Sequence, residues 1–170
     1  MKSVLFVCSA NMCRSPMAEA LLGKLIGERG ETAEWRIESA GVGATEGQPA
    51  TGNTQLVAAE RGMDLSRHHS KPATRATLEP FPLVLVMDEG HRRRLREAAP
   101  ELADRVYLLS EMVGLSSEVW DPVGGEIENY RAMADQIDGI LRTGFDRLRE
   151  LAGHPADRHG KDRGSRPESK

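Results

Sequence analysis

Hydrophobic residues along the chain occur in short runs separated by segments of helical or polar character. Three runs, at residues 4–7, 83–87 and 106–109, are continuous and rich in Val and Leu. Such runs are typical of strands buried on both faces of a parallel sheet. Residues 35–38 alternate in polarity and predict another short strand. Strands that alternate with helices favour parallel pairing through right-handed crossovers.

Helical segments are predicted between and after these strands from apolar spacing and capping residues. The expected helices span residues 14–28, 54–61, 74–78, 91–98 and 126–148. Asn53 and Asp88 are the expected N-caps of the second and fourth of them, because a short polar side chain there accepts a hydrogen bond from the first turn. Gly62 is expected to end the second helix.

Together these elements predict an α/β three-layer sandwich, in which a parallel sheet carries helices on both faces. Ligands of such sheets bind at the carboxyl ends of the strands. A single domain is expected over residues 1–152. From residue 153 onward apolar side chains are scarce and charges mix with Gly and Pro, which predicts a disordered tail over residues 153–170.

Charge and cysteine content narrow the class of protein. The 170 residues carry a formal net charge of -3, which argues against a nucleic-acid binder because such proteins are basic. No apolar run is long enough to span a membrane, and no secretion signal is recognisable. The two cysteines lie in one loop, unlike the disulfide framework of a secreted protein. We expect a cytoplasmic monomer that contacts neither nucleic acid nor membrane.

Candidate chemistry lies where the first strand ends at Cys8 and the next helix begins near Arg14. A strand–loop–helix turn aims backbone N–H groups and a helix N-terminus at one point, which favours phosphate. The same dipole and the nearby Arg14 favour the thiolate of Cys8, which is the nucleophilic form. Arg14 also offers a planar fork of N–H groups that matches a phosphoryl group. The alternative interpretation is that Cys8 is a half-buried structural cysteine.

Residues 8–19, Cys-Ser-Ala-Asn-Met-Cys-Arg-Ser-Pro-Met-Ala-Glu, resemble the signature loop of the low-molecular-weight protein tyrosine phosphatases. The likeness runs from Met1 to about Ala152, and its further matching pieces are residues 38–41, 62–66, 68, 86–88, 121–122 and 124–125. The resemblance implies a four-stranded sheet in the order 2-1-3-4. It also implies hydrolysis of phosphomonoesters on proteins or peptides through a cysteinyl-phosphate, with inorganic phosphate as the product.

Three residues are expected to carry the reaction: Cys8 as nucleophile, Arg14 as phosphate clamp and Asp121 as general acid. From the residues alone, Asp121 before Pro122 is a typical turn former. The resemblance instead implies that Asp121 protonates the leaving oxygen and later activates water. Trp120 is expected to lower the polarity around this carboxylate. Neither cysteine has partners at metal-ligand spacing, so no metal or cofactor is expected.

The expected phosphate-binding loop consists of Ser9, Ala10, Asn11, Met12, Cys13, Arg14 and Ser15. The resemblance implies that Asn11 holds this loop in a strained turn, that Ser15 donates a hydrogen bond to the thiolate, and that Ser39 and His68 support Asn11. For His68, a surface position beside His69 is the alternative. The other histidines are expected to be exposed: His91, His154 and His159.

Cys13 is a candidate redox partner of Cys8, because a disulfide between them would protect an oxidised sulfur from irreversible steps. The resemblance implies the same pairing. The alternative is a structural Cys13 that only packs under the loop.

Around the expected substrate pocket the chain departs from the family pattern. Ala10 stands where the family usually has glycine, and strain is expected if the backbone there has a positive φ. Residues 41–53 lack the aromatic side chain that lines the pocket in many members, and Val123 and Gly124 replace paired tyrosines. A less aromatic pocket is therefore expected.

Phosphotyrosine is the favoured substrate, because Met12 can lie against its ring. Protein-arginine phosphatases share the fold and are the alternative: residues 39–42 and 121–125 resemble theirs, although they carry Thr at the position of Met12. A thioredoxin-coupled arsenate reductase on this fold needs further cysteines, and none follows Cys13. A non-catalytic phosphate-binding module also stays open.

Overall fold

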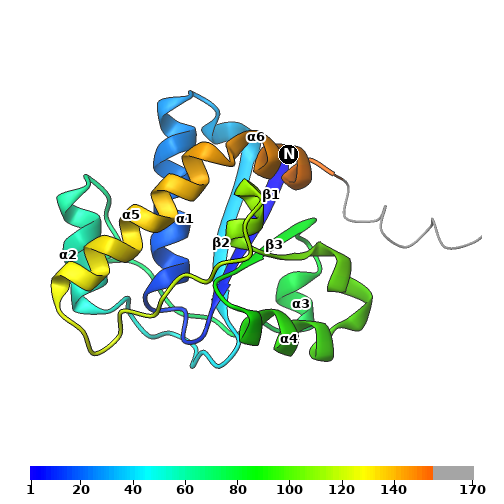
Figure 1. Cartoon of the computed structure of the whole chain (residues 1–170), viewed down its shortest axis with the longest axis horizontal. Coiled ribbons are helices and arrows are strands. Elements are labelled where there is room, and N and C mark those ends of the chain that lie inside the picture. Colours follow the sequence, from blue (N-terminus) through cyan, green and yellow to red (C-terminus); the bar gives the residue numbers. More distant parts are fainter. Residues whose placement is uncertain (155–170) are drawn as a thin grey trace, which may run out of the picture.

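The computed structural model describes residues 1–154 and shows an α/β fold built on a four-stranded parallel sheet (Figure 1). The strands are β1 (Lys2–Cys8), β2 (Trp35–Gly41), β3 (Leu83–Val86) and β4 (Val106–Leu108). Their order in the sheet is β2-β1-β3-β4, which confirms the expected order 2-1-3-4. Residues 155–170, which make up most of the predicted tail, lie outside the described residues.

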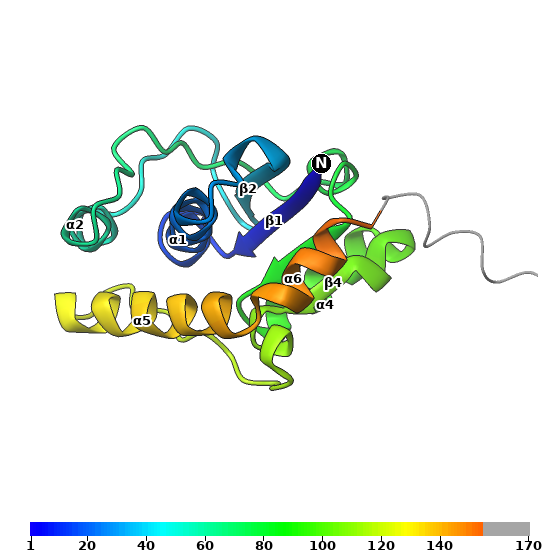
Figure 2. The same ribbon diagram turned by 90° about the horizontal axis from the view of Figure 1, so that it is seen from above.

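Helices cover both faces of the sheet. They are α1 (Arg14–Glu28), α2 (Gly52–Glu60), α3 (Arg75–Leu78), α4 (Glu89–Ala98), α5 (Ile127–Thr143) and α6 (Phe145–Ala152). Short 3-10 segments lie at Thr32–Glu34, Pro100–Arg105 and Leu109–Val113. Helices α1 and α5 lie side by side and in contact (Figure 2). Within this part of the chain, no helix is long and apolar enough to cross a membrane.

The central strand β1 explains why there are two helical layers. Val4 and Phe6 join a hydrophobic core formed with α1, α5 and α6. Leu5 and Val7 point to the opposite face and join a second core with α3 and α4. All four side chains are fully buried. The continuous apolar run therefore belongs to a strand covered on both faces, and the three-layer sandwich is confirmed.

The single helix expected over residues 126–148 is wrong, because the chain breaks at Gly144 into α5 and α6. At Gly144 the backbone passes directly against the 3-10 segment Leu109–Val113. A Cβ added at Gly144 would lie 2.7 Å from the carbonyl oxygen of Met112. This close approach requires a glycine, and it is a tertiary contact that helical spacing does not reveal.

Helix α2 also begins earlier than expected. Its N-cap is Thr51 rather than Asn53, because Thr51 Oγ1 accepts a hydrogen bond from the backbone N–H of Thr54 at 3.4 Å. The helix is followed, as expected, by Gly62 with a φ of 77°. The earlier start brings Thr51 next to the loop that follows β1, where Thr51 N–H donates to the carbonyl oxygen of Met12 at 2.9 Å.

Three strand ends meet where the candidate site lies. Cys8 is the last residue of β1, and Asp88 follows β3 and caps α4 by accepting from the N–H of His91 at 2.9 Å. Gly41 ends β2, and a Cβ there would lie 2.6 Å from the carbonyl oxygen of Ser9. The loop after Cys8 is therefore held between the carboxyl ends of the neighbouring strands.

Candidate active site

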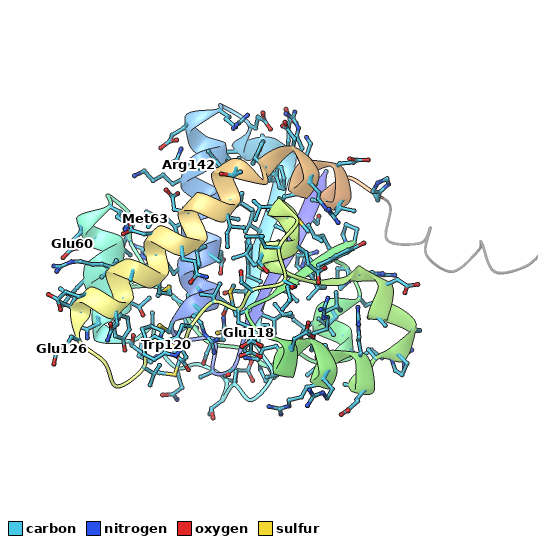
Figure 3. All side chains as sticks on the ribbon, in the orientation of Figure 1. Glu60, Met63, Glu118, Trp120, Glu126 and Arg142 are labelled. Atoms are coloured by element: carbon cyan, nitrogen blue, oxygen red, sulfur yellow. The ribbon has the colours of Figure 1, made fainter. Side chains whose placement is uncertain are left out.

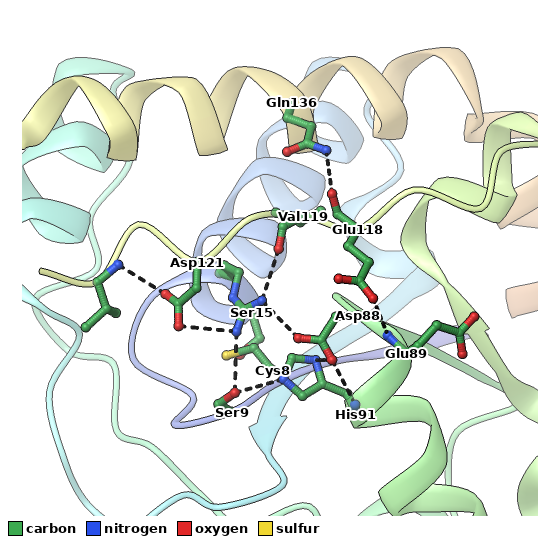
Figure 4. Close-up of polar contacts among 12 residues, drawn as sticks. Cys8, Ser9, Ser15, Asp88, Glu89, His91, Glu118, Val119, Asp121 and Gln136 are labelled. Carbon is green, nitrogen blue, oxygen red and sulfur yellow. Dashed lines mark hydrogen bonds and ion pairs between the residues drawn. The ribbon is translucent and has the colours of Figure 1, made fainter. Parts of the chain in front are cut away.

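The sulfur of Cys8 lies at the base of a loop that leads directly into α1. Cys8 is buried, and its Sγ lies 3.0 Å from Ser15 Oγ, at the start of α1 (Figure 4). Because a thiolate only accepts hydrogen bonds, the Ser15 hydroxyl donates when the sulfur is ionised. The helix N-terminus adds its positive partial charge at the same place.

The guanidinium of Arg14 is buried and held in one orientation. Its Nη1 donates to the carbonyl oxygen of Val119 at 3.0 Å and lies 3.4 Å from Asp88 Oδ2. Its Nη2 lies 3.4 Å from Ser9 Oγ and 3.5 Å from Asp121 Oδ2. One nitrogen is therefore anchored to the protein, and the other faces the loop and Asp121.

Cys8 and Arg14 line the same pocket, which has a volume of about 160 Å³. Its lining residues are Cys8, Ser9, Ala10, Met12, Cys13, Arg14, Thr51, Asp121 and Val123. No aromatic side chain stands among these described residues, in agreement with the less aromatic pocket expected from the sequence. The pocket walls are instead formed by small and aliphatic groups around the sulfur and the guanidinium.

Asn11 holds the loop from inside. It is the only non-glycine residue of the described chain with a positive φ, 56°. Its Nδ2 donates to Ser15 Oγ and to Ser39 Oγ, both at 2.9 Å, and its Oδ1 accepts from the N–H of Lys71 at 3.0 Å. Ala10 does not share this conformation, so its methyl group causes none of the strain considered for it.

His68 contacts the backbone of the same turn. Its Nε2 lies 2.6 Å from the carbonyl oxygen of Asn11, whereas His69 is exposed. Burial lowers the pKa of His68, and its hydrogen bond to Asn11 opposes that shift. The structure thus brings together the residues expected in the supporting network: Asn11, Ser15, Ser39 and His68.

Glu19 extends this network, although sequence analysis assigned it no role. The hydroxyl of Ser39 donates to Glu19 Oε2, and burial raises the pKa of the Glu19 carboxyl. The feature that could have pointed to Glu19 is the presence of an acidic residue in the first two turns of α1, on the side that faces β2. A chain of hydrogen bonds therefore leads from Glu19 through Ser39, Asn11 and Ser15 to the sulfur of Cys8.

Cys13 is buried beside the same pocket. Burial raises its pKa to about 12, despite a hydrogen bond with Thr54 that acts in the opposite direction. At neutral pH Cys13 is therefore a thiol.

Asp121 reaches the pocket from the segment that precedes α5. Glu118 ties this segment to both neighbouring helices: its carbonyl oxygen accepts from Gln136 at 3.1 Å, and its Oε1 accepts from the N–H of Glu89 at 3.2 Å (Figure 4). Asp121 Oδ1 accepts from the N–H of Val123 at 3.1 Å. The carboxylate is thus presented at the pocket mouth by a segment fixed at its start.

The expectation that Trp120 lowers the polarity around Asp121 is wrong. Trp120 lies on the loop that leads to α5 and is 70% exposed (Figure 3). The Asp121 side chain is itself 46% exposed. Val119 is buried, whereas its neighbour Trp120 is exposed.

The expectation that His91 is exposed is also wrong. His91 is 3% exposed, and its Nε2 lies 2.8 Å from Ser9 Oγ. The arginine-rich sequence that follows it indicates a solvated helix face, but α4 turns His91 toward the loop. His154 is half-buried rather than exposed, and His159 lies outside the described residues.

The fold and the loop define a class of cysteine-dependent phosphatases, and comparison with known proteins names the family. The family model for low molecular weight phosphotyrosine protein phosphatase matches residues 3–152, and the chain belongs to this family. It is therefore a cysteine-based hydrolase of phosphoric monoesters, with the fold of this family.

Relatives with two kinds of name are similar to the chain. A protein-arginine-phosphatase of Geobacillus stearothermophilus is 36% identical over 148 residues, which cover 86% of this chain and 93% of that protein. The low molecular weight protein-tyrosine-phosphatase Wzb of Escherichia coli K12 is 34% identical over 140 residues, which cover 82% of this chain and 90% of Wzb.

Solved structures show the same two names. The low molecular weight protein tyrosine phosphatase from T. tengcongensis matches with a TM-score of 0.81 and 37% identity, covering 86% of this chain and 99% of that one. The YwlE arginine phosphatase from Geobacillus stearothermophilus matches with a TM-score of 0.79 and 34% identity, covering 91% of this chain and 98% of that one.

Proposed function

We propose that this phosphatase hydrolyses phosphotyrosine in proteins, with Cys8 as the nucleophile. The observation that carries the assignment of Cys8 is its place in the pocket. Its sulfur lies 3.0 Å from the Ser15 hydroxyl, at a helix N-terminus, and shares the pocket with the anchored Arg14. This arrangement supplies an ionisable sulfur and an anion site together, as phosphoryl transfer to a thiolate requires.

In the first step the phosphoryl group binds the loop N–H groups of residues 9–14 and the guanidinium of Arg14. The Cys8 thiolate attacks phosphorus, an S–P bond forms and the P–O bond to the leaving group breaks. Asp121, in its protonated form, gives its proton to the leaving oxygen. Arg14 is suited to this step because Val119 and Asp88 already fix its orientation, so little reorganisation accompanies charge build-up.

In the second step water attacks phosphorus and the carboxylate of Asp121 takes its proton. The S–P bond breaks, inorganic phosphate leaves and the Cys8 thiolate is restored. The Ser15 hydroxyl stabilises this leaving sulfur by donating a hydrogen bond to it. Asp121 acts as acid and then as base, and it ends the cycle protonated.

The substrate preference rests on the pocket walls. Ala10, Met12 and Val123 line the space above the sulfur. A thioether and aliphatic groups suit the ring of phosphotyrosine, since sulfur contacts with aromatic rings are favourable. The side chain of Met12 has no oxygen with which to accept a hydrogen bond from a guanidinium group.

Phosphoarginine is the second candidate, because the family members similar to this chain include protein-arginine phosphatases. Three residues of the pocket lining carry side-chain oxygens that could accept a hydrogen bond from its guanidinium: Ser9, Thr51 and Asp121. Hydrolysis of phosphotyrosine and phosphoarginine peptides by one preparation tests the choice, with Cys8→Ser as the inactive control. We expect a higher kcat/KM for phosphotyrosine; a large preference for phosphoarginine would overturn the proposed substrate.

The redox role of Cys13 is part of the same proposal. Peroxide oxidises the Cys8 thiolate to a sulfenic acid, and the Cys13 sulfur then displaces water to form a disulfide. A cytoplasmic location, a monomeric state and independence of metals stay predictions from the sequence.

A further inference from the structure

The first turn of α4 contacts the phosphate-binding loop through a buried histidine. His91 is 3% exposed, and its Nε2 lies 2.8 Å from the Oγ of Ser9, the residue directly after Cys8. Ser9 itself is exposed at the pocket. This contact fixes a hydroxyl group that lies within 3.4 Å of Arg14 Nη2.

Asp88 completes a closed arrangement with these residues (Figure 4). Its Oδ1 accepts from the backbone N–H of His91 at 2.9 Å and lies 3.4 Å from His91 Nδ1. Its Oδ2 lies 3.4 Å from Arg14 Nη1. Ser9, His91, Asp88 and Arg14 thus form a ring of polar contacts, which we call the α4 ring. His91 belongs to α4 and Asp88 is the N-cap of that helix.

The tautomer of His91 decides which way the Ser9 hydroxyl points. Burial lowers the pKa of His91 to about 4, so the imidazole is neutral near pH 7. Nδ1 makes no regular hydrogen bond within residues 1–154, but it faces the carboxylate of Asp88, which favours a proton on Nδ1. Nε2 then carries a lone pair and accepts the Ser9 O–H.

This direction suits the guanidinium. With its hydrogen directed to His91, the Ser9 oxygen presents lone pairs to the N–H of Arg14 Nη2. If Nε2 carried the proton, the Ser9 hydrogen would be free to turn toward Arg14, and two donors would face each other. The same Nη2 faces Asp121 at the pocket mouth, so it is the nitrogen available to a phosphoryl oxygen.

We propose that His91 is a positioning residue, which acts through the Ser9 hydroxyl to hold Arg14 Nη2 in the orientation that binds the phosphoryl group. The inference rests on the proposed function only in taking Arg14 as the phosphate clamp. His91 touches neither the substrate nor the reacting atoms. Its effect is expected in the binding of phosphate and in kcat, since the equatorial oxygens gain charge in the transition state.

Substitutions at position 91 test directly whether a hydrogen-bond acceptor for the Ser9 hydroxyl is needed at the position of Nε2. In His91→Gln the side-chain oxygen can take the place of Nε2, whereas in His91→Asn the shorter side chain replaces only the Nδ1 side. We expect His91→Asn to lose about tenfold in kcat on a phenyl phosphate ester and to weaken inorganic phosphate binding, which is the effect of about one hydrogen bond. His91→Gln should retain both within about threefold.

A double-mutant cycle separates this role from a general packing role. Ser9→Ala is expected to show the same loss as His91→Asn, and the double variant no more than the larger single loss, because both remove one interaction. If the losses in kcat of Ser9→Ala and His91→Asn multiply in the double variant, or if His91→Gln loses as much as His91→Asn, His91 has only a packing role. Circular dichroism checks that His91→Asn folds. If it does not fold, Ser9→Ala serves as the test, because Ser9 is exposed. Unchanged phosphate affinity in Ser9→Ala would overturn the inference.

Calorimetric measurement of phosphate affinity tests the role of His91 independently of catalysis. A wild-type protein that binds phosphate but hydrolyses substrate no faster than Cys8→Ser would contradict the proposed activity. The dependence of phosphate affinity on His91 and Ser9 would still decide the role of the α4 ring.

Discussion

Arg14 and Asp121 face each other across the mouth of the pocket, with Arg14 Nη2 3.5 Å from Asp121 Oδ2. The proposed phosphate clamp and the proposed general acid are thus in contact before a substrate arrives. In the proposed mechanism, a bound phosphoryl group takes over the contact with Nη2 and leaves the Asp121 carboxyl beside the leaving oxygen. Since the Asp121 side chain is 46% exposed, it can adjust without breaking buried contacts.

Asp121→Asn is expected to lower kcat on phenyl phosphate by about a hundredfold or more, because the variant cannot protonate the leaving oxygen. The loss should be smaller for p-nitrophenyl phosphate, whose leaving group needs less protonation. Phosphate affinity should rise by up to about fivefold, because a carboxylate no longer competes for Arg14.

The matched control is Asp135→Asn, which removes an exposed carboxylate of α5 that pairs with Arg61. Its kinetics should equal those of the wild type. Equal losses for the two leaving groups in Asp121→Asn would exclude a role of Asp121 in protonation.

Cys13→Ser is expected to make inactivation by peroxide largely irreversible. Wild-type protein should regain activity after treatment with a dithiol, and a peptide that links Cys8 to Cys13 should be found by mass spectrometry. Equal recovery in the two proteins, with no linked peptide, would assign Cys13 a purely structural role.

The disulfide should close faster at higher pH. Burial raises the pKa of Cys13 to about 12, so its thiolate fraction grows about tenfold for each pH unit below that value. The rate of disulfide formation can be measured by quenching the peroxide reaction at successive times, at neutral and at mildly alkaline pH. A closing rate that does not change with pH would contradict this account, because it would show that Cys13 is already ionised in this range or that its ionisation does not limit the reaction.

Asn11→Ala is expected to lower the free energy of unfolding by about 2–4 kcal/mol, because it places alanine at a positive φ and leaves buried polar partners unsatisfied. Asn11→Gly loses the same hydrogen bonds but accepts the backbone conformation. Chemical denaturation should therefore show Asn11→Gly to be about 1 kcal/mol more stable than Asn11→Ala. The reverse order would contradict the backbone role of Asn11.

Local patterns predicted the parts of the molecule that local interactions determine. The helix from Arg14 to Glu28 has the bounds expected from spacing alone. Strand β1 ends at Cys8 as expected, although it begins at Lys2 rather than at Val4. The cap at Asp88 is also the expected one. The resemblance in residues 8–19 then supplied the sheet order and the identity of the site.

Tertiary contacts account for what the sequence did not reveal. Gly144 breaks the last helix because the backbone at Met112 lies against it. His91 is buried because α4 packs on a loop far from it in the sequence, although its neighbours are charged. Glu19 joins the network through Ser39, which lies on another element. None of these contacts produces a periodic signal.

The central claim is that an ionised Cys8 sulfur faces an anion site completed by Arg14. The most direct measurement is the rate of alkylation of Cys8 by iodoacetamide at neutral and mildly acidic pH, followed by mass spectrometry with and without inorganic phosphate. We predict labelling faster than that of a cysteine peptide, protection by phosphate, and loss of that protection in Arg14→Ala. A rate equal to that of the peptide, with no effect of phosphate, would contradict the claim.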